Sequence, residues 1–323
     1  MKTMATTRRG GFSLIELLTV ISILALLMAI SAGAYFRIRS AQDQTNTEAT
    51  MSKINTGMDK KWKAVLDQST EEVKQEQIPE VQVLIANLNG NKDLARTIWA
   101  YIRMRSEFPT TFREAQTPLV VGFVTFQPRK IFLPPALPLW STVPAVPVEE
   151  QSAACLYIAL TQSGNRGETF GGDGTGNQAR DLNLTGAPAG TLPVKVYMDS
   201  WNKPLAFCRM GYSAEVQNPP FSKVPTPAAP AVALRDPFDP TGQIVRYAAA
   251  NALNAASLAS FWSELNKYHM TIGGVSPAPA LYAPQNWVPT TISAGRNQVF
   301  GAGIGTDDDL LSYRLRREGT KGD

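Results

Sequence analysis

A single carboxylate, Glu16, lies inside a long apolar run near the N-terminus. From Phe12 to Phe36 it is the only side chain that is charged at neutral pH. At about 1.5 Å per residue, a helix of this length crosses a hydrocarbon core of roughly 30 Å. A carboxylate inside a membrane costs roughly 2.5–3.5 kcal/mol, so a sequence that keeps one needs a partner for it. The run has no positive side chain of its own, and we therefore expect that partner on another subunit at membrane depth.

A short basic leader precedes the apolar run. Lys2, Arg8 and Arg9 supply its charge, and two glycines separate it from the first apolar residue. Positive flanking side chains stay on the cytoplasmic side of a membrane. We therefore expect a single-pass protein of the inner (cytoplasmic) membrane, with a cytoplasmic N-terminus and everything after Phe36 on the outer side.

The stretch Gly11-Phe12-Ser13-Leu14-Ile15-Glu16-Leu17-Leu18 resembles the N-terminus of type IV prepilins and of the pseudopilins of type II secretion. The resemblance implies that a prepilin peptidase cuts between Gly11 and Phe12 and methylates the new amine of Phe12. It also implies that Glu16 neutralises the Phe12 ammonium of a neighbouring subunit entering a filament. The implied partners are prepilin peptidase, other pilin or pseudopilin subunits and an inner-membrane assembly platform. Beyond these residues the apolar arm agrees with the family only in character.

Two other interpretations of the N-terminus stay open. A secretory signal would use Ala32-Gly33-Ala34 as its cleavage site, but Glu16 and the length of the run argue against it, since apolar signal cores have about 7–15 residues. A plain single-pass anchor explains the hydrophobicity but neither Gly11 nor Glu16. The alternative function is then a membrane-anchored extracytoplasmic binding or sensor protein, and, with less support, an anchored hydrolase.

Charge and cysteine content limit the partners. The formal net charge is +4, and loss of Lys2, Arg8 and Arg9 with the leader leaves 4 − 3 = +1. The basicity therefore belongs largely to the leader and gives no reason to expect nucleic acid. Cys155 and Cys208 are the only cysteines. On the oxidising, exported side they could form one disulfide, and two isolated thiols are the other expectation.

The first element that positions this chemistry is the continuation of the helix. Apolar side chains recur every three or four positions over residues 37–68, at Ile38, Ala41, Met51, Ile54, Met58, Trp62 and Val65. This spacing predicts an amphipathic helix whose apolar stripe packs on the domain that follows. Over residues 69–91 the pattern is interrupted, and we expect short helices there because Pro79 cannot continue a helix interior.

Residues 69–323 are expected to form one extracytoplasmic α+β domain. Helices are predicted over residues 92–108, 150–162 and 248–269, and strands over 119–126, 194–197, 206–210 and 290–293. Arg96, Arg103 and Arg105 of the first helix are expected to form a solvated face, with a binding patch as the alternative. A proline-rich stretch follows, and its apolar side chains need cover, either from the core of the domain or from a neighbouring subunit. These side chains are Ile131, Phe132, Leu133, Leu137, Leu139 and Trp140.

The segment Asp199-Ser200-Trp201-Asn202-Lys203-Pro204 resembles the Asp-x-Trp-Gly-x-Pro turn in the C-terminal sheet of pseudopilins, with Asn202 in place of glycine. Together with the N-terminal motif, it implies a pilin-like α+β fold. In that fold a long N-terminal transmembrane and amphipathic helix packs on an antiparallel sheet domain. Here the domain is enlarged and carries extra helices.

Two stretches have the residue types of a calcium loop. Asp173, Thr175 and Asn177 alternate as calcium ligands do, but Leu184 occupies the position of the closing glutamate, so we expect a plain loop. The stretch 293–312 resembles the closing segment of pseudopilins, which in the major pseudopilin holds a calcium ion. The resemblance makes Asp307 and Asp309 candidate calcium ligands, and an acidic surface turn is the alternative.

Catalysis has little support in the sequence. His269 is the only histidine, it has no nucleophile-elbow motif nearby, and no His or Cys cluster suggests a transition-metal site. We therefore expect a non-enzymatic structural subunit of a pilus-like filament or a secretion pseudopilus. The size of its outer domain favours a minor or specialised subunit.

The expected segments are a leader at 1–11, a transmembrane helix at 12–36, its amphipathic continuation at 37–68 and the outer domain at 69–323.

Overall fold

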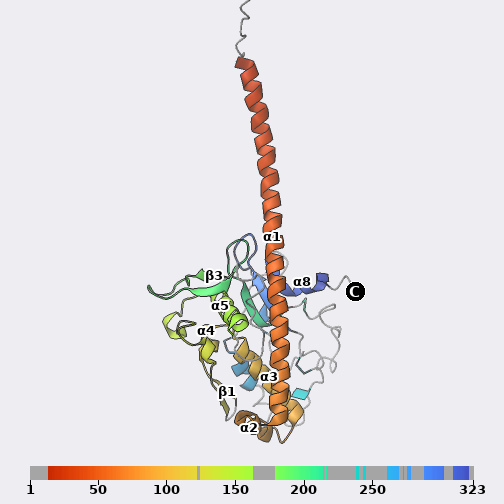
Figure 1. Cartoon of the computed structure of the whole chain (residues 1–323), viewed down its shortest axis with the longest axis vertical. Coiled ribbons are helices and arrows are strands. Elements are labelled where there is room, and N and C mark those ends of the chain that lie inside the picture. Colours follow the sequence, from red (N-terminus) through yellow and green to blue (C-terminus); the bar gives the residue numbers. More distant parts are fainter. Residues whose placement is uncertain are drawn as a thin grey trace, which may run out of the picture. The chain divides into compact units, whose positions relative to one another are not determined.

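The computed structural model describes residues 14–121, 124–162, 179–213, 215–216, 238–239, 243–244, 260–268, 272, 275–277, 287–301 and 308–319. Its helices are α1 (Leu14–Gln75), α2 (Pro79–Asn87), α3 (Lys92–Glu107), α4 (Phe112–Gln116), α5 (Val148–Thr161) and α8 (Ser312–Gly319), with short 3-10 turns η1 (Lys130–Phe132) and η2 (Trp140–Thr142). Its strands are β1 (Leu119–Val121), β2 (Val124–Phe126), β3 (Ala179–Leu182), β4 (Val194–Tyr197), β5 (Ala206–Tyr212), β6 (Ser276–Pro277), β7 (Val288–Ser293) and β8 (Leu310–Leu311). A long N-terminal apolar helix followed by antiparallel sheets and extra helices confirms the α+β prediction (Figure 1).

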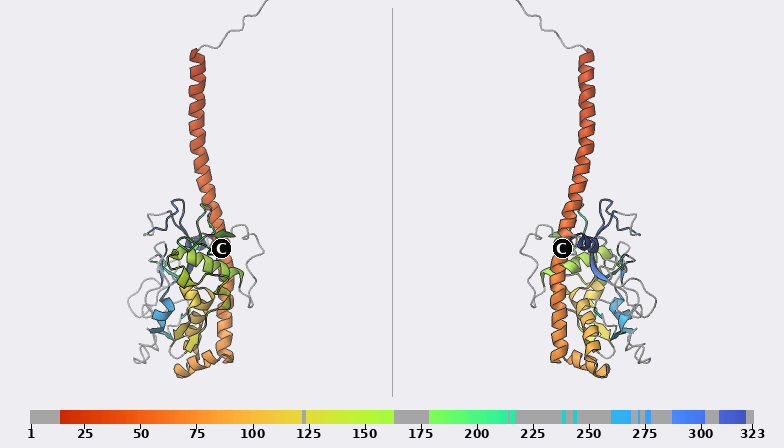
Figure 2. Two further views of the ribbon diagram at one scale, coloured as in Figure 1. Left: turned by 90° about the vertical axis from the view of Figure 1, so that its left-hand side faces the viewer. Right: turned by 90° about the vertical axis from the view of Figure 1, so that its right-hand side faces the viewer.

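The chain divides into two compact units, residues 1–45 and 46–323, and α1 contributes to both. Within the second unit, α1 runs along the domain (Figure 2) and buries Met51, Ile54, Met58 and Val65, which confirms that part of the predicted stripe. The stripe does not extend to Ile38, which is exposed. The helix also continues to Gln75 instead of ending at residue 68, because Val73 adds a further buried apolar position and the first proline comes only at Pro79.

The helices α2 and α3 have clear end signals. Pro79 begins α2, a position where its missing N–H removes no hydrogen bond, and Gly90, with φ +78°, lets its N–H return to Ile85 O at 2.9 Å. Asn91 caps α3 by accepting a hydrogen bond from Leu94 N at 3.0 Å. The resulting α3 matches the predicted helix over 92–108 to within one residue.

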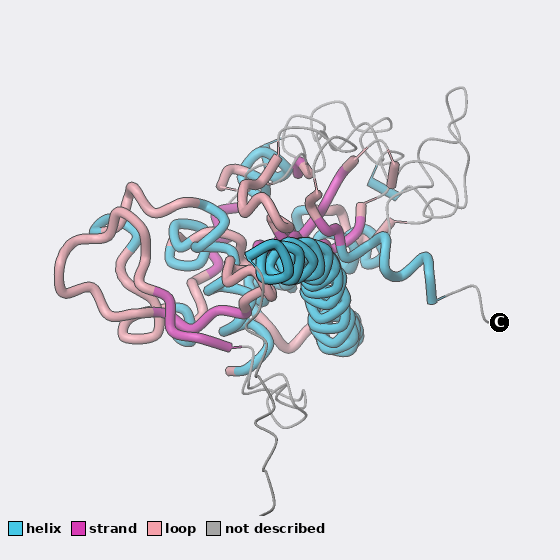
Figure 3. The backbone as a smooth tube through the Cα atoms, turned by 90° about the horizontal axis from the view of Figure 1, so that it is seen from above, coloured by secondary structure: helices cyan, strands magenta, loops and turns pink. Residues whose placement is uncertain are grey.

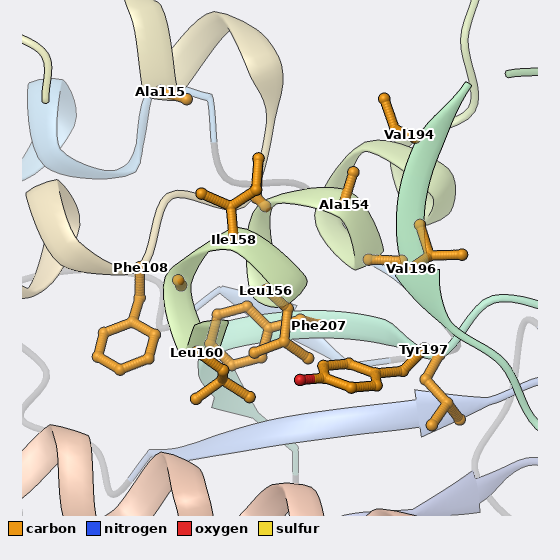
Figure 4. Close-up of a cluster of buried hydrophobic side chains, with 14 of the residues drawn as sticks. Phe108, Ala115, Ala154, Leu156, Ile158, Leu160, Val194, Val196, Tyr197 and Phe207 are labelled. Atoms are coloured by element: carbon orange, nitrogen blue, oxygen red, sulfur yellow. The ribbon is translucent and has the colours of Figure 1, made fainter. Parts of the chain in front are cut away.

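The central sheet has four antiparallel strands in the order β6-β5-β7-β8, with Ala206 opposite Ile292 and Cys208 opposite Thr290. Alternation along β5 directs neighbouring side chains to different clusters. Phe207 packs with α5, as Figure 4 shows, and its N–H donates to Ser152 Oγ at 3.0 Å. Cys208 instead packs in a separate cluster with Ile292 and the start of α8.

Two smaller sheets flank these elements. The strand predicted over 119–126 is in fact two strands, β1 and β2, which fold back on each other with Val121 opposite Val124. The strand β4 was predicted correctly and pairs with β3. Short strands set among helices and much loop complete the layout (Figure 3).

The core of the domain covers part of the proline-rich stretch between β2 and α5. Phe132 and Leu137 are buried in the same cluster as α5. Leu139 and Trp140 remain exposed, at 50% and 37%. The predicted helix over 248–269 is described only in its last part, where Phe261 and Leu265 are buried.

Candidate functional site

The N-terminal arm of α1 presents an apolar surface that nothing in its own unit covers. Its large side chains from Leu14 to Ile38 are exposed, with Leu14 at 82% and Ile30 at 62%. Among the described helices, α1 is the one long and apolar enough to cross a membrane, with a mean hydropathy of 2.5 over its most apolar 18 residues. An exposed surface of this kind requires lipid or protein around it.

Glu16 lies in the first turn of this arm. The hydroxyls near it bond within the helix, since Thr19 Oγ1 donates to Glu16 O at 2.9 Å and Ser22 Oγ to Leu18 O at 2.8 Å. Hydroxyls paired in this way can enter an apolar medium without an unsatisfied donor. The predicted cleavage residues Gly11 and Phe12 lie outside the described residues.

Within the second unit, polar contacts tie α1 to segments that come much later in the chain. Thr47 Oγ1 accepts a hydrogen bond from Ser200 N at 3.0 Å, and Asn55 Nδ2 donates to Ser312 O at 3.2 Å. All the groups involved except Ser200 are buried. These bonds hold the turn after β4 and the start of α8 against the helix.

Further along α1, Glu72 joins the helix to α3. Its carboxylate accepts from Trp99 Nε1 at 2.7 Å and from Arg103 Nη2 at 2.8 Å. Arg103 is therefore not part of a solvated face, and the expectation of such a face for α3 is wrong for this residue. Arg96, which is exposed and pairs with Asp93, fits it.

A buried ion cluster centres on Glu114 of α4. One carboxylate oxygen accepts from Arg209 Nη2 at 2.8 Å and lies 3.3 Å from Arg105 Nε, while the other accepts from Thr110 N at 2.6 Å. Arg209 also donates to Phe108 O at 3.0 Å. Arg105 and Arg209 are 5% and 1% exposed, so the predicted solvated face is wrong for Arg105 as well. Burial lowers the pKa of Arg105, and the neighbouring Glu114 partly offsets this.

A second ion group lies beside it. Glu107 of α3 accepts from Arg129 Nη1 and is 3.8 Å from Lys61 Nζ of α1. The Lys61 ammonium also donates to Ala159 O at the end of α5. Desolvation by burial lowers the pKa of Lys61 to about 8, against the opposing influence of Glu107. This group connects α1 to α3 by an ion pair and α1 to α5 by a hydrogen bond to a backbone carbonyl.

The turn after β4 is built on Asp199, as its resemblance to the pseudopilin turn suggested. Asp199 Oδ1 accepts from Trp201 N at 3.0 Å and Lys203 N at 2.8 Å, and Oδ2 accepts from Ser293 Oγ at 2.7 Å. Asn202 has φ +65°. That left-handed conformation explains why glycine or asparagine is suited to the position.

The C-terminal aspartates hold a backbone turn. Gly295 begins the turn with φ +64°, Asp308 Oδ2 accepts from Asn297 N at 2.8 Å, and Asp309 Oδ2 accepts from Gly301 N at 3.0 Å. Asp307 lies outside the described residues. In the described ranges no group of three or more His, Cys, Asp or Glu side chains could hold a metal. Calcium binding by Asp307 and Asp309 stays a prediction.

Cys155 on α5 and Cys208 on β5 are both buried free thiols. The structure thus has no disulfide between them, because strand alternation places Cys208 in a different cluster from the one that contains Cys155. Burial raises the pKa of both thiols. His269 and the glycine-rich stretch that contains Asp173 lie outside the described residues.

Sequence reasoning missed the residues that anchor α1 and the ion clusters. The bonds that join Thr47 to Ser200, Asn55 to Ser312, Glu72 to Trp99 and Glu114 to Arg209 connect residues 27 to 257 positions apart, beyond the reach of any local pattern. One signal was present for Glu114, since Thr111 caps α4 and Glu114 stands three residues later, as in a capping box.

Comparison with known proteins agrees with the N-terminal features. Residues 6–32 match the family model for the prokaryotic N-terminal methylation motif, the hallmark of type IV prepilins and pseudopilins. The comparisons with curated proteins and with solved structures found no significant match. The matched segment contains Gly11, Phe12 and Glu16. The chain is thus prepilin-like, with an N-terminus of the kind that prepilin peptidase processes and an N-terminal apolar helix that fits a membrane anchor.

Proposed function

We propose that this chain, which carries the N-terminal methylation motif of type IV prepilins and pseudopilins, is a structural subunit of a pilus-like filament or a type II secretion pseudopilus. The match of residues 6–32 to that motif carries the proposal. The exposed apolar arm of α1 supports it, because a filament interior covers such a surface after the subunit has left the lipid.

Processing is proposed to remove residues 1–11. Prepilin peptidase cuts between Gly11 and Phe12 and methylates the amine of Phe12. The mature chain then has a transmembrane helix at 12–36, the continuation of that helix to Gln75 and an outer domain that packs on the continuation. Before assembly it spans the inner membrane with its N-terminus on the cytoplasmic side, where the leader charges lie.

Glu16 is proposed to pair with the Phe12 ammonium of the neighbouring subunit. In the membrane its carboxylate is costly, and the ammonium on Phe12 of an adjacent subunit lowers that cost by charge pairing. An inner-membrane assembly platform and other pilin or pseudopilin subunits are the partners that this step requires. The large outer domain, well beyond what dense packing in a shaft needs, favours a minor or specialised position in the filament.

The N-terminus of the mature protein tests the proposal. The chain is purified from membranes of a cell that has prepilin peptidase, and its first residues are determined by mass spectrometry. We expect N-methylated Phe12, and we expect a Gly11→Val variant to keep the leader. An N-terminus at Tyr35 would indicate a secretory signal, and an intact leader on the unaltered chain would indicate a plain anchor for a binding or sensor domain.

A further inference from the structure

A small pocket adjoins the buried ion cluster of the outer domain. The volume open to the centre of a water molecule is about 30 Å³, and the lining comes from α3, α4, Thr117, Leu119 and residues 126–129. A single water needs roughly 10–15 Å³ of space of this kind, so the pocket has room for a ligand of a few atoms. Gln127 on its lining is exposed, so the pocket reaches the surface.

The guanidinium of Arg105 is a buried cation at this pocket, and its hydrogen bonds are incomplete. The side chain is 5% exposed and lines the pocket. Its Nε lies 3.3 Å from Glu114 Oε1, but without hydrogen-bond geometry, so that Nε has no hydrogen-bond partner in the described part of the chain. Glu114 is meanwhile held by Arg209 and Thr110. A buried guanidinium ordinarily has both its charge and its N–H groups satisfied.

The charges around the pocket are unbalanced. The two ion groups contain only two carboxylates, Glu107 and Glu114. They contain four cations, which are Lys61, Arg105, Arg129 and Arg209. A further carboxylate, Glu264, acts on Arg105 but is itself paired with Lys267. The excess positive charge favours an anion.

Neutral donors complete the lining. Ser106, Thr117 and Gln127 all line the pocket. Their side chains show no hydrogen bond to any described residue, whereas Gln116, next to Thr117 and outside the pocket, bonds Pro138 O at 2.8 Å. The lining also includes Arg129 and one carboxylate, Glu114, which Arg209 and Thr110 already hold. Two guanidinium groups, two hydroxyls and an amide outnumber that carboxylate and suit the oxygens of a small carboxylate or a similar monoanion.

We propose that this pocket is an anion-binding site for a carboxylate-sized monoanion, with Arg105 as its principal ligand and Ser106, Thr117 and Gln127 as supporting donors. The carboxylate comes either from a free small anion or from an Asp or Glu side chain of another polypeptide that reaches the pocket mouth. The site belongs to the outer domain alone and is independent of the proposed filament function.

Titration of the full-length protein with formate tests the proposal. The protein is solubilised in a neutral detergent with gluconate, too bulky for the pocket, as the starting anion at constant ionic strength. Binding is followed by the melting temperature and by broadening of the ¹³C-formate resonance. We expect formate to bind saturably to the unaltered chain. Its affinity should fall about ten-fold or more in Arg105→Gln, because about one charge-assisted hydrogen bond is lost. Arg96→Gln, an exposed change on the same helix, should bind as the unaltered chain does.

A second variant keeps the test decisive if Arg105→Gln does not fold. Thr117→Val leaves every described ion pair in place and should weaken formate binding by roughly three-fold or more. Absence of saturable binding by the unaltered chain, or equal binding by Thr117→Val and Arg105→Gln, would overturn the proposal. Aspartate blocked at both backbone ends distinguishes the sources, because tighter binding than formate indicates a protein-borne carboxylate and weaker binding a free anion.

Discussion

The Ser293 hydroxyl donates a 2.7 Å hydrogen bond to Asp199 Oδ2, and this bond joins the end of β7 to the turn after β4. The same turn rests on α1 through Ser200 N and Thr47 Oγ1. Ser293 Oγ also accepts from Gly295 N at 3.2 Å, at the start of the C-terminal turn. The turn at Asp199 and Ser200, together with Ser293, thus links the first helix, the central sheet and the C-terminal segment.

Replacing Ser293 by alanine should reduce the free energy of unfolding by about 1–2 kcal/mol, because Asp199 Oδ2 and Gly295 N both lose a partner in a buried place. Urea denaturation followed by circular dichroism measures the change. Ser52→Ala, an exposed substitution on α1, is the control and should alter the free energy by less than about 0.5 kcal/mol. Equal stability of the two variants would contradict the linking role.

Asn202 should prefer glycine to alanine as its replacement. Its φ is +65°, and its amide oxygen accepts from Arg180 Nη1 at 2.8 Å. Both substitutions remove that hydrogen bond, so the difference between them isolates the Cβ. Asn202→Gly should be about 1 kcal/mol more stable than Asn202→Ala, as measured by urea denaturation. The reverse order would show that the turn does not require the left-handed conformation.

Gly295 should not tolerate alanine. A Cβ there would overlap the backbone carbonyl oxygen of Asp308, and the φ of +64° adds a conformational penalty. We expect a loss of more than about 3 kcal/mol in the free energy of unfolding. Gly190→Ala is the matched control, since Gly190 has φ +88° but open space around it, and it should cost only about 1 kcal/mol. Similar losses in both variants would rule out the steric reason.

Lys61 should make stability rise with pH in the alkaline range. Burial lowers its pKa from 10.5 to about 8. Between these values the folded state binds fewer protons than the unfolded state, so the free energy of unfolding increases as pH rises through that window. Lys61→Met should remove the increase, and Lys63→Met, at an exposed position of the same helix, should keep it. Thermal or urea unfolding from pH 7 to 10.5 measures the slopes, and equal slopes in all three proteins would contradict the assignment.

Glu16→Ala should block incorporation into filaments while membrane insertion stays intact. The apolar arm still supplies the insertion energy, but the carboxylate that pairs with the Phe12 ammonium is gone. Fractionation of membranes and of purified filaments measures the two steps separately. Ser22→Ala, whose hydroxyl bonds within the helix, should behave as the unaltered chain does. Normal incorporation of Glu16→Ala would rule out the pairing role.

Local patterns were sufficient for several elements. The spacing of Met51, Ile54 and Met58 predicted the buried side of α1, and Pro109 predicted the end of α3. The turn at Asp199 was predicted because its chemistry lies within six consecutive residues. The predicted end of the long helix at residue 68 and the single strand predicted over 119–126 were wrong. Val73 is buried by packing, and β1 and β2 are separated by their pairing with each other, and neither effect shows in a periodic pattern.

By itself, the sequence determined the N-terminal motif, the apolar arm around Glu16 and the α+β class, because these depend on consecutive residues and their periodicity. Only the tertiary structure decided that Arg105 and Arg209 are buried on Glu114 and that Cys155 and Cys208 stay apart. The physical reason is the same for both. The environment of a polar or thiol side chain depends on groups distant in sequence, and the chain brings them together only when its helices and strands pack.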